Sequence, residues 1–197
     1  MNFLIVVPKY DRSTLDPVYA FPMGLAYISS ALKTAGYFVD ILDLNRYYGY
    51  VQDGDWTPLR MLIRRKMLEK QYNCVCTGGL SADYDHVKAI IKAAKAEKPD
   101  TVFIVGGNLV SSMPETVVKG LGADFGVIGE GEETILEFAE SLSAGKQDFS
   151  AIAGLAYPDD FGGITLTPTR IAKNDINTIP MPDYEGFDIR YHPHNPA

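Results

Sequence analysis

Cysteine and histidine are scarce in this chain of 197 residues, and neither is spaced for a metal site. The cysteines are Cys74 and Cys76, and the histidines are His86, His192 and His194. No C-x-x-C or zinc-ligand spacing occurs, so no metal-binding residue is predicted. The two thiols are two positions apart and would share one face of a strand. We expect both to be small, buried hydrophobic side chains in a reducing compartment.

Basic charge and long apolar runs are also lacking. The chain has 18 Lys and Arg against 25 Asp and Glu, a net charge of −7, which argues against nucleic acid or an anionic membrane as a partner. No apolar run approaches the roughly 18 residues that a membrane-spanning helix needs. The apolar N-terminal run is too short for a signal peptide. We therefore expect a cytoplasmic protein with neither a nucleic-acid nor a membrane partner.

Short apolar segments alternate with longer amphipathic ones along most of the chain. Helices are expected between successive strands and after the last, with one beginning at Asp83 or Asp85. This alternation predicts an α/β fold in which helices cover both faces of a five-stranded parallel sheet. Five strands fit the flavodoxin-like, doubly wound order 2-1-3-4-5 without needing a sixth. The predicted strands are 3–7, 38–42, 74–77, 101–105 and 125–128.

The pattern changes near residue 150. Residues 154–157 and 163–167 flank a turn of about five residues, which predicts a small C-terminal β-hairpin. From residue 173 onward, dense proline predicts a linker. We therefore divide the chain into a flavodoxin-like domain, 1–148, and a hairpin with a linker, 149–197, leading toward a further domain.

Four loops follow the predicted strands at the edge of the sheet where doubly wound folds bind ligands. Three of these loops contain paired or nearly paired glycines, which permit positive φ and let a ligand approach the backbone. For a single loop, the glycines are equally well explained as tight turns. Three such loops on one edge favour a binding site. The loops are 8–22, 78–83, 106–112 and 129–133.

The residue types exclude several ligands and catalysts at this edge. The segment 129–134 resembles G-x-G-x-x-G, but Glu130, Glu132 and Glu133 would repel a phosphate at the start of the helix, which argues against NAD. FMN stays open as an alternative, because the loop after the first strand contains Ser13 and Thr14. No nucleophile accompanies His86, and segment 77–79 lacks a receiver-type aspartate. No catalytic residue is predicted.

Several short motifs occur in a characteristic order and spacing along nearly the whole chain. They are the first strand ending in Pro8, then 22–28, 36–39, 105–108, 113–115, 129–134, 152–157, Arg170 and 179–183. With these motifs in this order, the chain resembles the N-terminal cobalamin (B12)-binding domain of B12-dependent radical SAM proteins, the BchE-like family.

The resemblance implies that the strand ends hold a corrinoid. The rim of a corrin ring carries neutral amides, which need hydrogen-bond donors and acceptors rather than an anion site. The nucleotide tail needs a slot where backbone approaches closely. The cofactor-binding residues implied are Pro8, Tyr10, Gly24, Leu25, Gly78, Gly79, Ser81, Gly106, Gly107, Asn108, Gly129, Glu130 and Gly131.

Two motifs are missing. The D-x-H-x-x-G motif is absent, so no histidine from that motif is available as the lower ligand of cobalt. The resemblance therefore implies a cobalt that binds neither a histidine nor its own nucleotide base (base-off, His-off) and faces Tyr10 or a water. Without C-x-x-x-C-x-x-C, the [4Fe–4S] cluster and S-adenosylmethionine would belong to a C-terminal radical SAM domain of the parent protein. The parent would catalyse methyl transfer or a radical rearrangement or cyclisation, and this chain alone would not. A ligand-free flavodoxin-like interaction module remains the alternative.

Overall fold

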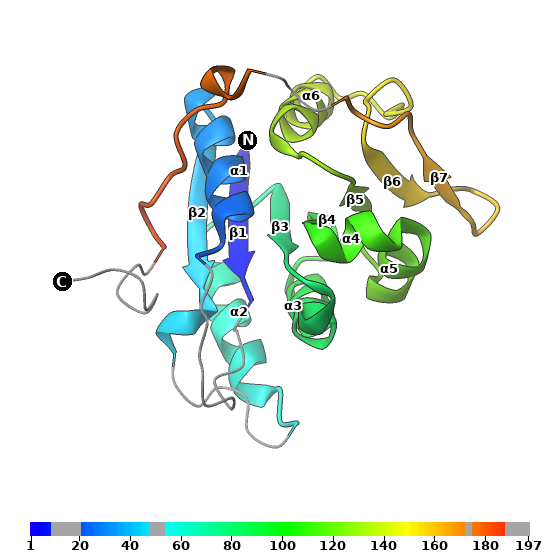
Figure 1. Ribbon diagram of the computed structural model, residues 1–197. Coiled ribbons are helices and arrows are strands. Elements are labelled where there is room, and N and C mark those ends of the chain that lie inside the picture. The colour runs from blue at the N-terminus through cyan, green and yellow to red at the C-terminus, as the bar shows by residue number, and fades with distance from the viewer. Residues whose placement is uncertain (9–20, 48–53, 172–174, 188–197) are drawn as a thin grey trace.

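The computed structural model describes residues 1–8, 21–47, 54–171 and 175–187. Seven strands in these ranges form one sheet in the order β2-β1-β3-β4-β5-β6-β7 (Figure 1). The first five strands along the chain pair in parallel, which confirms the flavodoxin-like order 2-1-3-4-5. The strands are β1 Asn2–Val7, β2 Phe38–Asp43, β3 Cys74–Gly78, β4 Val102–Gly106, β5 Phe125–Val127, β6 Leu155–Pro158 and β7 Ile164–Leu166.

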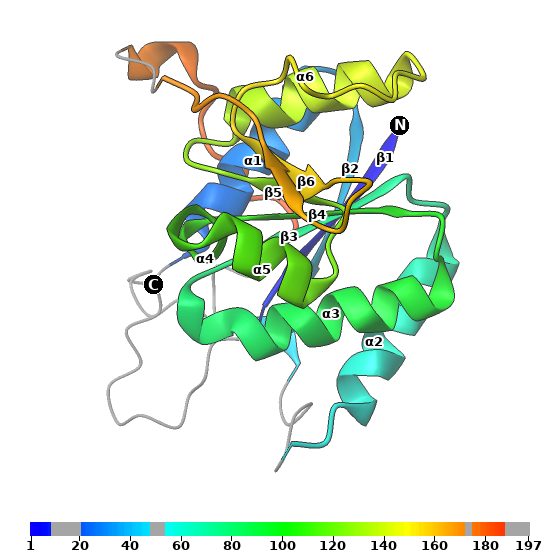
Figure 2. The same ribbon diagram turned by 90° about the vertical axis from the view of Figure 1, so that its right-hand side faces the viewer.

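Helices cover both faces of the sheet (Figure 2). One face, here called the α1 face, is covered by α1 (Met23–Thr34) and α6 (Glu132–Ser143). The opposite α3 face is covered by α2 (Thr57–Glu69), α3 (Tyr84–Glu97) and α5 (Pro114–Leu121). No helix in the described ranges is long and apolar enough to cross a membrane. Shorter helical segments are α4 (Asn108–Ser112), η1 (Leu44–Arg46), η2 (Ser81–Asp83) and η3 (Ile176–Thr178).

The two faces have separate cores, because successive strand residues point to opposite sides. Val75, Phe103 and Val105 belong to the core of the α3 face. Cys76 and Ile104, their neighbours in the same strands, belong to the core of the α1 face. Both faces are buried, so the strands read as continuous apolar runs, as the sequence indicated.

The C-terminal hairpin extends the sheet. We expected it as a small appendage, but β6 pairs antiparallel with β5, and β7 pairs with β6. Leu155 lies opposite Val127, and Ala156 is buried in the core of the α3 face. Without β6, the backbone of β5 would be an unpaired sheet edge. The hairpin therefore belongs to the same body as the five parallel strands.

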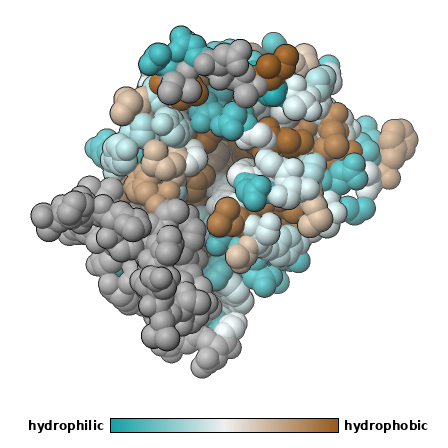
Figure 3. Space-filling model, in the orientation of Figure 1, coloured by the Kyte–Doolittle hydropathy of each residue, from teal (hydrophilic) through white to brown (hydrophobic). Residues whose placement is uncertain are grey.

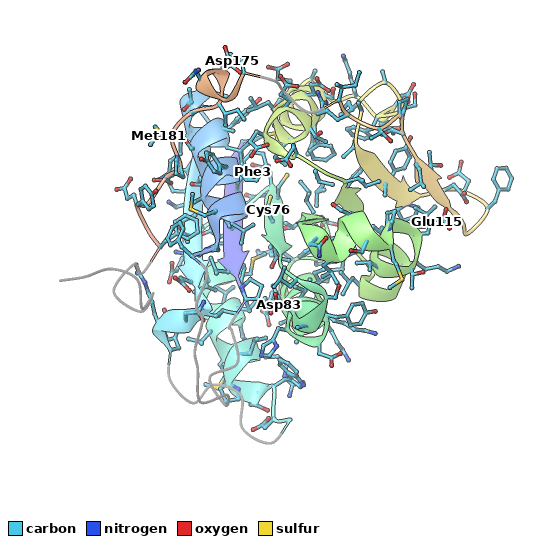
Figure 4. The ribbon with its side chains drawn as sticks, in the orientation of Figure 1. Phe3, Cys76, Asp83, Glu115, Asp175 and Met181 are labelled. Carbon is cyan, nitrogen blue, oxygen red and sulfur yellow. The ribbon has the colours of Figure 1, made fainter. Side chains whose placement is uncertain are left out.

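The segment 175–187, here called the strap, is anchored where the sequence predicted a linker. It lies alongside α1, where Met181 is labelled in Figure 4. The N–H of Asp183 donates to the carbonyl of Ala26 at 3.1 Å, and its carboxylate accepts the Ser29 hydroxyl at 2.5 Å. Phe187 is buried against the beginning of α1. Apart from the short helical segment η3, the strap contains no helix or strand, and these contacts anchor it.

Candidate ligand-binding site

A cavity of about 320 Å³ opens on the α1 face, at the carboxyl ends of β3, β4 and β5. Its walls come from α1, from the ends of these strands with the loops that follow, and from the beginning of α6. Figure 3 shows a hollow in this face with apolar residues around it. The volume is at the lower end of the roughly 300–1,000 Å³ that ligand pockets occupy.

The floor of the cavity is apolar except for the buried hydroxyl of Thr77, which has no hydrogen-bond partner among the described residues. Cys76, Ile104 and Val127 contribute to it from three adjacent strands, and Ile28 and Ile135 contribute from α1 and α6. Burial raises the pKa of the Cys76 thiol to about 12, so the thiol is neutral at physiological pH. Cys76 can be followed on β3 in Figure 4. As the sequence predicted, both cysteines are buried and free.

Gly106 keeps this floor open. A Cβ atom added at Gly106 would meet nothing closer than Val127 Cβ at 3.7 Å, an ordinary van der Waals distance. The neighbouring structure would therefore accept a side chain at this position. The backbone conformation of Gly106 is also ordinary, since its φ is not positive. The missing side chain leaves space on the cavity side of β4.

The other glycines at the β3 and β4 ends are explained by contact between two loops. A Cβ at Gly78 would lie 2.5 Å from the Gly106 carbonyl oxygen. Gly107 has φ +82°, and its Cβ would lie 2.9 Å from the Gly79 carbonyl oxygen. That carbonyl accepts the N–H of Leu109 at 3.0 Å. Close backbone contacts therefore account for Gly78 and Gly107, whereas Gly106 has no such constraint.

Carboxylates surround the outer part of the cavity. Glu130 and Glu132 line it, and Glu132 and Glu133 stand in the first turn of α6, where they favour the helix dipole. No lysine or arginine is among the described residues that line the cavity. Arg170 instead lies outside it and binds Glu133 at 3.0 Å. This distribution disfavours a ligand that depends on phosphate for its affinity.

The structure brings most of the predicted site residues to this one cavity. Pro8 does not line it; its carbonyl accepts the Asn45 side-chain amide at 3.0 Å. Ser81 is exposed in η2 and does not line it either. Tyr10 lies outside the described residues, as do Ser13, Thr14, His192 and His194. The predicted residues that line the cavity are Gly24, Leu25, Gly78, Gly79, Gly106, Gly107, Asn108, Gly129, Glu130 and Gly131.

The floor residues were not among the predicted site residues. Glycines pointed to the loops, whereas the strands were interpreted only as core. The alternation within β3 and β4 could have placed Cys76 and Ile104 on one face, next to Gly106. Within the described ranges, no group of His, Cys, Asp or Glu is arranged to hold a metal ion.

Comparison with known proteins places this arrangement in a family. A family model described as the B12 binding domain matches residues 17–139. Cytidylyl-2-hydroxyethylphosphonate methyltransferase of Streptomyces wedmorensis is 29% identical over 161 residues, which cover 77% of this chain and 30% of that protein. An uncharacterized methyltransferase of Synechocystis is 30% identical over 115 residues, or 58% of this chain and 18% of that protein. The chain thus spans less than a third of these relatives.

Solved structures share the fold. The radical S-adenosylmethionine methyltransferase TsrM of Kitasatospora setae, with cobalamin and a [4Fe–4S] cluster bound, has a TM-score of 0.72 and 22% identity. The match covers 94% of this chain and 32% of TsrM. The cobalamin-dependent S-adenosylmethionine radical enzyme OxsB, with aqua-cobalamin and S-adenosylmethionine bound, has a TM-score of 0.69 and 15% identity, covering 92% of this chain and 24% of OxsB.

Proposed function

This chain belongs to the family of B12-binding domains, and on that premise we propose that it binds cobalamin at the cavity of the α1 face. The observation that carries the proposal is the open, apolar floor beside Gly106. Gly106 has room for a side chain and has none, which is expected where a ligand takes the space.

The cavity is large enough for only one part of cobalamin. A corrin ring with its amide side chains is larger than a cavity of about 320 Å³, whereas a flat two-ring base fits one. The nucleotide tail therefore enters the cavity, and the corrin lies over the carboxyl ends of the strands. The chain holds the cofactor mainly by burying its apolar base.

The polar rim of the cavity serves the corrin amides. The Gly79 carbonyl is already bonded to Leu109, and the Gly129 N–H donates to the Ser111 hydroxyl at 2.9 Å. The side chains of Asn108 and Glu130 line the same edge and supply polar contacts with the amides in this proposal. An amide presents both donors and acceptors, so it suits both of these side chains.

The parent protein, in this proposal, is a B12-dependent radical SAM enzyme. Bound cobalamin supplies a cobalt centre that carries a methyl group. S-adenosylmethionine and the [4Fe–4S] cluster are held by a radical SAM domain outside this chain. Methyl transfer is favoured over rearrangement or cyclisation, because two of the relatives are named as methyltransferases. The present chain binds and orients the cofactor and does not catalyse alone.

Titration with hydroxocobalamin tests the proposal. We expect a change in the visible absorbance spectrum and retention of colour after desalting. Gly106→Leu fills the floor and is expected to weaken binding about 100-fold, since the ligand and the new side chain compete for one space. Ala144→Leu is the matched control, because it adds the same side chain at the exposed C-terminal end of α6. No binding by the unaltered chain would refute the proposal, and FMN is titrated in parallel.

A further inference from the structure

Resting on the proposed function, we infer that this cavity selects among corrinoids by their lower base, admitting an apolar benzimidazole and disfavouring a purine. The selection follows because the floor of the cavity has few hydrogen-bonding groups. A benzimidazole buries carbon and methyl groups, whereas adenine brings several ring nitrogens and an exocyclic amine that require hydrogen bonds once water is removed.

The side chains of the floor offer almost no such bonds. Ile104, Val127 and Ile135 are 4%, 7% and 2% exposed and carry no nitrogen or oxygen in their side chains. The strand backbone beneath them is paired within the sheet. Ile104 pairs with Cys76 and Phe125, and Val127 pairs with Leu155. A purine placed there would keep polar atoms without partners.

Two side chains that line the cavity beside the strands carry a polar hydrogen, Cys76 and Thr77. The Cys76 thiol is 4% exposed and neutral, and a thiol is a weak donor and a weak acceptor. The Thr77 hydroxyl is buried and has no hydrogen-bond partner among the described residues, so it can bond one ring nitrogen of a base. One hydroxyl and one thiol cannot satisfy the several polar atoms of adenine. Each unsatisfied polar atom costs about 5- to 150-fold in affinity, so the selection is measurable even if only one remains unpaired.

Two glycines on the cavity wall differ in what they contribute to this selection. A Cβ at Gly131 would lie 3.0 Å from Ile28 Cδ1 and 3.3 Å from Val127 Cγ1, so the wall itself leaves little room there. At Gly106 the nearest atom is 3.7 Å away. The depth available to the base is therefore set at Gly106, and a substitution there acts on the ligand without straining the wall.

The experiment compares three probes by absorbance titration: aquocobalamin, the adeninyl cobamide, and cobinamide, which has no nucleotide. We expect aquocobalamin to bind at least about 10-fold more tightly than the adeninyl cobamide. Gly106→Leu is expected to lower the affinity for aquocobalamin to that for cobinamide, while cobinamide binding stays within about two-fold. This pattern would assign the lost affinity to the nucleotide tail and not to the corrin ring.

Val127→Thr provides the second variant, because it places a hydroxyl on the floor with little change in volume. We expect it to narrow the affinity ratio between the two cobamides by about three-fold or more. Val105→Thr is the matched control, since the same change on the α3 face should leave the ratio unaltered. The thermal stability of each variant is measured alongside, and a ratio is insensitive to the folded fraction.

The outcomes separate the two claims. Equal affinity for both cobamides, or cobinamide binding as tightly as aquocobalamin, overturns the inference and leaves cobalamin binding in place. Failure of the unaltered chain to bind any of the three corrinoids overturns the proposed function, and the inference falls with it. The inference is also overturned if Val105→Thr changes the affinity ratio between the two cobamides as much as Val127→Thr does.

Discussion

The α3 face and the α1 face are built from alternate residues of the same strands, but they differ at the carboxyl ends of those strands. On the α3 face, Phe103 and Val105 are fully buried in a core that also contains residues of α2, α3 and α5. On the α1 face, which has a buried core of its own, the neighbouring Ile104 and Gly106 border a cavity of about 320 Å³. The backbone is shared, and the missing side chain of Gly106 leaves space on one side of it. A sheet buried on both sides can thus be packed closely on one side and keep a cavity on the other.

The largest expected effect is a truncation on the filled face. Phe103→Ala removes a fully buried ring and should lower the free energy of unfolding by about 3–5 kcal/mol, because the packed surroundings cannot close the void. Urea denaturation measures it. A loss below about 1 kcal/mol would mean that the α3 face is not the stability core described here.

One substitution made on each face gives a sharper comparison. Val105→Ala on the α3 face is expected to cost about 2 kcal/mol, from two buried methyl groups. Val127→Ala should cost less than about 1 kcal/mol, because that side chain already borders open space. Equal losses in thermal or urea unfolding would contradict the difference between the faces.

A half-buried carboxylate beside each face gives the next effect, which depends on pH. Burial raises the pKa of Asp183, but hydrogen bonds from Lys33 and Ser29 outweigh it and leave the pKa below its usual value. On the other face, burial of Asp40 is likewise outweighed by Lys66 and Tyr72. Each carboxylate therefore stabilises the fold above the unfolded-state pKa of about 3.9, and that contribution is lost as pH falls through the folded-state pKa.

Asn replacements separate the two carboxylates. Asp183→Asn and Asp40→Asn should each cost roughly 1–2 kcal/mol at pH 7, with the difference from the unaltered chain shrinking below about pH 4. Only Asp183→Asn should also weaken hydroxocobalamin binding, because Asp183 holds α1, which forms a wall of the cavity. Identical binding by both variants would show that the strap does not support the site.

The smallest effect concerns charge at the rim. Glu130→Gln should strengthen binding about two- to three-fold at low salt, since it removes a carboxylate near the single phosphodiester of the cobalamin tail. Glu115→Gln on α5 is the control. The gain should vanish at high salt, and a gain that persists there would point to a steric rather than an electrostatic cause.

Local sequence patterns were sufficient to predict the five parallel strands. Apolar runs and intervening helices predicted five strands within about one residue, and the flavodoxin-like order was the better fit to that number. The hairpin and the strap depend on distant partners instead. Nothing in the local pattern shows that β6 completes the edge of β5, or that Asp183 bonds Ser29, 154 positions earlier.

The site was predictable at its rim and not at its floor. Glycine pairs marked the loops that line the cavity, although Gly78 and Gly107 are explained by close contact with neighbouring backbone. Asp83, one of the two residues predicted to begin the third helix, stands at the N-cap position of α3, but its carboxylate accepts the N–H of Leu80 at 2.8 Å rather than an N–H of α3. These are properties of how loops meet, and a linear sequence does not show which loops will meet.

The strap also sets an order of events during synthesis. The α3 face draws most of its contacts from strands and helices complete by Val127, whereas α1 receives Asp183 and Phe187 only after the ribosome has added some 60 more residues. At about 5–20 residues per second, that delay lasts roughly 3–12 s. The nascent protein therefore passes through an interval in which the five parallel strands are complete and α1 is not yet fastened by Asp183 and Phe187.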